Sequence, residues 1–204
     1  MRQNLLIVAL ILLADQALKI WVKLTMMLGQ EHRITDWFIL HFTENPGMAF
    51  GLEWGGDVGK YLLTIFRIAA SVWIFTWLVK LNRNHVPAVA QISVALVLAG
   101  AVGNLIDSLF YGLLFDHSYH QVATLFPKGG GYAGFMLGHV VDMFYFPLIH
   151  TTLPDWIPFW GGKEFLFFQP IFNIADASIT VGVGLMIVYQ RYLFEKNAQQ
   201  HSVA

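Results

Sequence analysis

The sequence predicts an all-α polytopic membrane protein with four transmembrane helices and a small β-rich segment at the membrane interface. Of its 204 residues, 56% are hydrophobic and only 12% are charged, which is too apolar for an ordinary soluble domain of this length. Cysteine is absent, so disulfides, a thiol nucleophile and a cysteine-based zinc site are excluded. A net charge of −1 without a basic run excludes a nucleic-acid partner, because phosphate binding needs clustered Lys and Arg.

Four stretches are apolar over the roughly 20 residues that a helix needs to cross a bilayer core. They cover about residues 4–23, 61–79, 86–107 and 172–192. Asp15 and Lys19 inside the first stretch argue against a cleaved signal peptide, so this stretch is expected to remain as an anchor. No internal repeat or second soluble domain is visible, and residues 1–204 are therefore predicted to form one integral membrane domain.

The charges of the segments between the spans predict their orientation. The two tails and the short loop after Lys80 hold five basic residues against one acidic residue. The two long connections, 24–60 and 108–171, hold five basic residues against ten acidic ones when the span-edge Lys23 and Asp107 are included. Both termini are therefore predicted on the cytoplasmic side and both long connections on the outer side.

The outer connections have their own structural signals. Residues 36–42 are rich in aromatic and β-favouring side chains, which predicts short strands lying at the interface. The second connection is too long for a bare loop, and it contains a triple glycine at 129–131 and an aromatic-rich stretch at 144–168. It is predicted to fold onto the membrane surface.

Ionisable groups within the spans are candidates for function, because they are costly there unless paired or hydrated. Asp15 and Lys19 are four residues apart, and they either neutralise each other or help to hold a site together. Arg67 is expected to extend its guanidinium outward to the interface. Asn173 and Asp176 share one face at the start of the fourth span, where Asn173 is also a candidate helix cap.

Further polar groups belong to the same end of the spans. The third span ends with Asn104 and Asp107, which we interpret as a site residue and a structural residue, respectively. Asp142 lies in an apolar segment expected to be a short strand or turn. From the residues alone, nothing pairs Asp142 with Asp176.

Taken together, these residues resemble the pattern of the lipoprotein signal peptidase (signal peptidase II) family. Five stretches carry the resemblance in the family's order, which makes it specific. They are Asp15-Gln16-Ala17-Leu18-Lys19, Asn45-Pro46-Gly47-Met48-Ala49-Phe50-Gly51, Gly103-Asn104-Leu105-Ile106-Asp107, Val140-Val141-Asp142 and Phe172-Asn173-Ile174-Ala175-Asp176. The resemblance implies a metal-independent aspartic endopeptidase of the bacterial inner membrane, with its site near the periplasmic face.

Residue roles follow from the same resemblance. It assigns catalysis to Asp142 and Asp176. It assigns substrate binding or support of the site to Asp15, Lys19, Asn45, Gly47, Phe50, Asn104 and Asn173. The turn from Asn45 to Gly51 is expected to lean over the site as a lid, although an ordinary turn is the alternative.

The implied partners are membrane lipid and prolipoproteins whose lipobox cysteine carries diacylglyceryl, cleaved just before that cysteine. No metal and no cofactor are expected, and oligomeric state and lipobox preference stay open. Two departures from the family pattern stand out. Ser108 occupies a position where the family commonly has arginine, for which Arg67 is a candidate substitute, and the connections on both sides of Asp142 are longer than usual.

Two other classes of protein remain as alternatives. A small transporter or proton-coupled channel would use Asp15, Lys19 and Asp176 as a relay, but it predicts inverted halves, which the hydropathy pattern lacks. A non-catalytic lipid-binding scaffold would tolerate replacement of Asp142 or Asp176 by asparagine. None of the eight histidines belongs to a His-Glu-x-x-His zinc motif.

Overall fold

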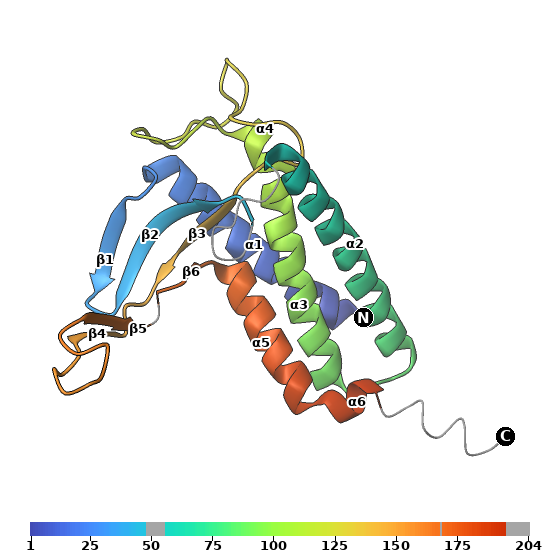
Figure 1. Cartoon of the computed structure of the whole chain (residues 1–204). Coiled ribbons are helices and arrows are strands. Elements are labelled where there is room, and N and C mark those ends of the chain that lie inside the picture. The colour runs from blue at the N-terminus through green and yellow to red at the C-terminus, as the bar shows by residue number, and fades with distance from the viewer. Residues whose placement is uncertain (48–55, 168, 195–204) are drawn as a thin grey trace.

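The computed structural model describes residues 1–47, 56–167 and 169–194. Four helices lie side by side, and the strands gather at one end of them (Figure 1). These helices are α1 (Arg2–Thr25), α2 (Gly56–Arg83), α3 (Ala88–Ile106) and α5 (Ile174–Val188). A π-helical turn, η2 (Asp107–Tyr111), and the short α4 (Gly112–Leu114) continue α3, and α6 (Gln190–Phe194) follows α5.

Three helical segments are long and apolar enough to cross a membrane: Arg2–Thr25, Gly56–Arg83 and Ala88–Leu114. They overlap the first three predicted spans, and the third helical segment begins at Ala88, two residues after the predicted start. The fourth predicted span contains α5, which is apolar but has 15 residues, followed by α6. The chain is therefore a multi-pass membrane protein.

Helices α1 and α2 bury several of their polar side chains and expose many of their large apolar ones. The buried residues of α1 are Asn4, Asp15, Lys19, Val22 and Lys23. Large apolar side chains of α1 and α2 are exposed instead, including Leu10, Leu13, Phe66 and Trp73. This arrangement is the reverse of a water-soluble bundle, and it suits a surface surrounded by hydrocarbon, where lipid rather than water contacts the apolar side chains.

The β structure is more extensive than a small segment in an otherwise all-α protein. A four-stranded antiparallel sheet has the order β1-β2-β3-β6, and a separate hairpin pairs β4 with β5. The strands are β1 (Glu31–Thr35), β2 (Phe38–Asn45), β3 (Val140–Tyr145), β4 (Ile149–Thr152), β5 (Glu164–Phe167) and β6 (Ile171–Phe172). The predicted strands in the first outer connection are confirmed. Their pairing with β3 joins the two connections, which local sequence patterns do not reveal.

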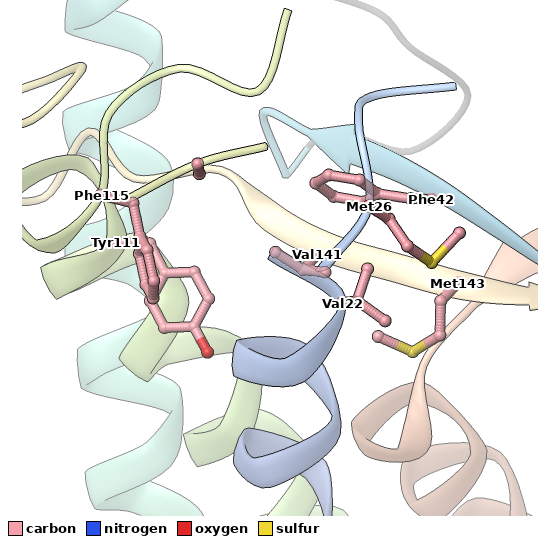
Figure 2. Close-up of a cluster of buried hydrophobic side chains, with 8 residues drawn as sticks. Val22, Met26, Phe42, Tyr111, Phe115, Val141 and Met143 are labelled. Atoms are coloured by element: carbon pink, nitrogen blue, oxygen red, sulfur yellow. The ribbon is translucent and has the colours of Figure 1, made fainter. Parts of the chain in front are cut away.

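A buried apolar cluster fixes this sheet to the helices. Val22 of α1 and Met26, which directly follows α1, pack with Phe42 of β2 and with Val141 and Met143 of β3 (Figure 2). Tyr111 and Phe115, at the end of the α3 segment, complete the cluster with ring centroids 5.0 Å apart. Asp142 lies between Val141 and Met143 of this cluster, and its position is therefore set by this packing.

Close packing of α3 against α5 positions the start of α5. A side chain at Gly100 would collide with the backbone carbonyl of Ala175 in the first turn of α5. Ser178 of α5 donates a hydrogen bond to the carbonyl of Leu96 at 2.7 Å, about one turn further along the same contact. Small residues at such a contact let membrane helices approach closely, and they bring the polar first turn of α5 next to α3.

Candidate active site

Asp142 lies within β3, and its side chain is only 4% exposed. The side-chain amide of Asn173 donates a hydrogen bond to its Oδ1 at 2.7 Å, and the Asn45 side chain is a second partner. Burial, followed by the neighbouring carboxylate of Asp176, raises the pKa of Asp142 to about 7, although Lys19 and the hydrogen bonds from the two asparagines act in the opposite direction. This carboxyl group can therefore hold or release a proton near neutral pH.

Asp176 occupies the first turn of α5 and is half-buried. The Asn173 side chain accepts a hydrogen bond from the Asp176 backbone N–H at 2.9 Å, and Oδ2 of Asp176 accepts one from the Asn173 backbone N–H at 3.3 Å. This is a capping box, so Asn173 does cap the helix. Because its amide also donates to Asp142, the same side chain connects the two aspartates.

Asn104 of α3 is the second amide between the aspartates. Its Nδ2 donates to Oδ1 of Asp176 at 2.8 Å, while its Oδ1 accepts from Nδ2 of Asn173 at 3.1 Å and from Nζ of Lys19 at 2.9 Å. The predicted convergence of the ends of the third and fourth spans is thus confirmed. The structure also brings Asp142 to this point, which the residues alone did not predict.

Lys19 is fully buried below these amides and pairs with two carboxylates, Asp15 at 2.9 Å and Asp107 at 2.8 Å. Asp15 also accepts the backbone N–H of Ala175 at 2.9 Å, and Asp107 accepts that of Val141 at 3.2 Å. Both interpretations of Asp15 and Lys19 therefore apply. The two opposite charges neutralise each other, and Asp15 also connects α1 to α5 through its hydrogen bond with Ala175. Asp107 connects this cluster to β3 in the structural position expected for it.

Arg67 directs its guanidinium into the protein. NH1 donates to Oγ of Ser108 at 2.7 Å, and NH2 donates to the carbonyl of Gly47 at 3.0 Å. The expectation that Arg67 extends outward to the interface is therefore wrong, because two inward acceptors are available on η2 and on the turn after β2. The guanidinium lies against Ser108, the position where the family commonly has arginine.

The turn after β2 is held by α2 through a second cation. Lys60 donates to the carbonyl of Pro46 at 2.6 Å, one residue before Gly47. Gly47 has a φ of +95°, a conformation that favours glycine, and a Cβ there would lie 2.8 Å from the Arg67 guanidinium and displace it. Asn45 accepts the Gly47 N–H at 2.7 Å, which directs its amide group toward Asp142. The remaining residues of the expected lid, 48–51, which include Phe50, lie outside the described residues.

Sequence reasoning did not single out Gln16, although this residue is central to the cluster. Its Nε2 donates to Oδ1 of Asp107 at 2.9 Å, and its Oε1 accepts from the Tyr111 hydroxyl at 3.1 Å. Gln16 lies three residues before Lys19 and hence on the same helix face, which is the signal that could have identified it.

A second buried network, centred on Glu44, was also not predicted. Glu44 pairs with Lys23 at 2.7 Å, accepts from the Ser118 hydroxyl at 2.8 Å and lies 3.4 Å from Nδ1 of His139. Burial alone would raise the pKa of Glu44, but the contacts from His139, Lys23 and Ser118 lower it to about 2. This network fastens the long connection after α4 to α1 and to β2, next to Asn45.

The fold and the site together define a class of protein. Three membrane-crossing helices, a buried carboxyl group with a pKa near neutrality and a second carboxylate beside it provide the acid–base groups of a membrane-embedded aspartic hydrolase. Among the described residues, no group of three or more His, Cys, Asp or Glu side chains could hold a metal ion.

Comparisons with known proteins identify the family. The model of the signal peptidase (SPase) II family matches residues 7–192. A lipoprotein signal peptidase of Porphyromonas gingivalis is 51% identical over 183 residues, which cover 89% of this chain and 80% of the relative. One of Amoebophilus asiaticus is 36% identical over 199 residues, which cover 96% of this chain and 80% of the relative. A solved bacterial membrane enzyme shares the fold, with a TM-score of 0.58 and 23% identity over 96% of this chain and 92% of its own.

The chain belongs to the signal peptidase II family, and it is an aspartic peptidase of the membrane. The resemblance carried by the five sequence stretches is confirmed. Membership of this family does not favour the transporter, channel or scaffold alternatives. The family acts in the bacterial inner membrane.

Proposed function

We propose that Asp142 and Asp176 are the catalytic pair of this peptidase and that its substrate is a diacylglyceryl-modified prolipoprotein. Cleavage falls just before the lipidated cysteine. One observation carries the assignment: Asn173 donates 2.7 Å to Asp142 while forming the capping box with Asp176, so one residue holds both carboxyl groups. The two aspartates come from different elements, β3 and α5, and meet at the end of the helices where the sheet lies (Figure 1).

The proposed mechanism uses one proton shared by the pair. Two close carboxylates do not both ionise cheaply, and the raised pKa of Asp142 supports a singly protonated pair near neutral pH. The ionised member removes a proton from a water molecule, whose oxygen attacks the scissile carbonyl carbon. The protonated member first donates to the carbonyl oxygen, and the pair later protonates the leaving amine as the C–N bond breaks. Because the two groups titrate as a unit, neither is assigned permanently as acid or base.

The neighbouring groups keep this pair in position. Asn45, Asn104 and Asn173 supply the amides, and the cluster around Lys19 joins α1 to α3, to β3 and to the first turn of α5. Arg67 and Lys60 hold the turn at Pro46 and Gly47 beside the pair. We propose that this turn is the base of a lid over the substrate.

The same proposal covers the membrane arrangement. The chain acts as one domain with four spans, the last formed by α5 and α6, and with both termini in the cytoplasm. The site then lies near the periplasmic face, and the substrate's lipid chains reach it from the side while the signal peptide stays in the membrane. The uneven distribution of basic residues between the tails and the long connections supports this orientation.

The test is a cleavage assay on detergent-solubilised protein with a diacylglyceryl-modified prolipoprotein, with signal-peptide release followed by gel shift. We expect Asp142→Asn and Asp176→Asn each to reduce turnover by about 10³-fold or more, because each removes an acid–base group. The control is Asp36→Asn, because the side chain of Asp36 is 98% exposed and has no assigned role in the site. A chelator is expected to leave wild-type turnover unchanged. Near-normal turnover in either folded variant would refute the assignment of the pair.

A further inference from the structure

The tip of the β4–β5 hairpin, residues 153–163, carries aromatic side chains that the peptidase site does not use. Trp156 is 80% exposed, Phe159 is 92% exposed and Trp160 is 62% exposed. The hairpin projects beyond the end of the four-stranded sheet and reaches the level of α5 (Figure 1). Three large aromatic side chains on one short loop form an unusual surface for contact with water alone.

The backbone of the tip is closed by its own hydrogen bonds. Leu153 and Lys163 bond at 2.9 Å across the end of the hairpin, and Gly162 donates to Leu153 at 2.9 Å. Within the loop, Ile157 donates to Pro154 at 3.1 Å and Gly161 donates to Ile157 at 2.9 Å. A loop that satisfies backbone groups internally can enter an apolar medium at lower cost, because fewer N–H and C=O groups lose water as a partner.

The composition of the tip fits the boundary between lipid and water. Trp concentrates at that boundary, where its ring is buried and its N–H stays hydrated. Lys163 lies 5.9 Å from the centroid of the Trp160 ring, so a cation stands beside the aromatic group as it would near anionic headgroups.

An aromatic ladder joins the base of the hairpin to the membrane-crossing part of the protein. Phe146, just before β4, stacks on Phe38 with centroids 4.9 Å apart and on Phe172 with centroids 5.6 Å apart. Phe172 directly precedes α5, whose exposed residues include Val181 and Ile187. The apolar surface that faces lipid on α5 therefore continues through the ladder toward the hairpin.

We propose that the hairpin tip is a membrane-interface anchor, with Trp156, Phe159 and Trp160 inserted among the headgroups and upper acyl chains of the leaflet beside the site. The partner is the lipid surface itself. Because the ladder connects the hairpin to β2 and β6, which both pair with β3, the anchor fixes the height of the sheet, and hence of Asp142, above the hydrocarbon. This role is separate from catalysis and does not depend on which residues form the catalytic pair.

The cysteine-free sequence permits a direct test of depth. Phe159→Cys is labelled with an environment-sensitive fluorophore, and the full-length protein is reconstituted into vesicles of phosphatidylethanolamine and phosphatidylglycerol. Gly129→Cys is the matched control, because it lies in a separate loop of the same outer connection and a Cβ there meets nothing within 4 Å. Quenching is measured with nitroxide-labelled lipid and with aqueous iodide.

We expect nitroxide lipid to quench the Phe159→Cys probe strongly and iodide to quench it several-fold less than the Gly129→Cys probe. Adding Trp156→Ser and Trp160→Ser to Phe159→Cys is expected to raise iodide quenching toward the control value. Iodide quenching equal to that of the control in the single variant would overturn the proposal. Protection from both quenchers would also overturn it, because the tip would then be covered by protein. Each labelled protein is compared with wild type by thermal unfolding.

Discussion

Two groups of carboxylates lie within one hydrogen-bonded network, and they differ in what neutralises them. Asp15 and Asp107 share the ammonium of Lys19 at 2.9 and 2.8 Å. Asp142 and Asp176 instead bond to the amides of Asn173 and Asn104 at 2.7 and 2.8 Å. The boundary between the two groups is Asn104, whose carbonyl oxygen faces Lys19 while its NH2 group faces Asp176.

The difference has a chemical consequence. A buried ammonium supplies positive charge to the two carboxylates that it contacts, so the Lys19 cluster is suited to structure. An amide donates to a carboxylate without supplying a positive charge, and it therefore leaves the aspartate pair free to keep one shared proton. The structural cluster and the proposed catalytic pair are thus separated by a single layer of asparagine side chains.

Among the tests of this comparison, Lys19→Met has the largest expected effect. It leaves Asp15 and Asp107 buried without their cation, and we expect a loss of about 3 to 5 kcal/mol in the free energy of unfolding. Asp176→Asn should cost far less stability, because an amide replaces a carboxylate that has no ammonium partner among the described contacts. Thermal unfolding in detergent measures both, with the exposed Lys80→Met as control. Equal stability of Lys19→Met and wild type would show that the cluster does not need its cation.

The next test concerns Arg67. Removing the guanidinium in Arg67→Met frees the Gly47 carbonyl and the Ser108 hydroxyl, and we expect turnover to fall by about tenfold or more as the turn beside the pair loosens. Adding Ser108→Arg should restore part of the activity, because it brings a guanidinium back to the same place from η2. The steady-state parameters kcat and KM are measured separately for both variants. Arg33→Met, in an exposed strand, is the control. If the double variant is no more active than Arg67→Met, an arginine at position 108 does not replace the guanidinium of Arg67.

The smallest expected effect is a shift in the pH profile. The pKa of Asp142 is about 7, so activity should fall as pH rises through this region and the pair loses its shared proton. The Asn45 side chain lowers this pKa, and Asn45→Ala is therefore expected to move the alkaline limb to higher pH. The profile of kcat/KM against pH gives the shift. A limb that moves to lower pH, or not at all, would contradict this account of Asp142.

The free energy of unfolding should also decrease as pH rises. The native pKa of Asp142 lies above its ordinary value, so the folded protein binds this proton more tightly than the unfolded chain does. Its contribution to stability is then present in full at acidic pH and is lost as pH rises toward 7. Comparing Asp142→Asn with wild type across this range isolates that contribution.

The residues that sequence reasoning located best are those whose neighbours along the chain reveal them. An aspartate and a lysine four residues apart inside an apolar span, or an asparagine and an aspartate three apart at its start, stand out against their surroundings. Gln16 was overlooked because an uncharged amide within a membrane span is less costly than a charged group and therefore stands out less in the sequence. The Glu44 network was overlooked because its four members come from four separate stretches of the chain.

The sequence by itself determined the membrane class, three of the helices and the polar residues at their ends, because hydropathy and helical spacing are local properties. Family resemblance, not local pattern, related Asp142 to Asp176. Only the tertiary structure decided that β3 lies against β2 and β6, that Asn173 reaches Asp142, and that Arg67 from α2 meets Ser108. The two side-chain contacts join residues that are 31 and 41 positions apart along the chain. No local pattern contains them, because packing of the sheet against the helices creates them.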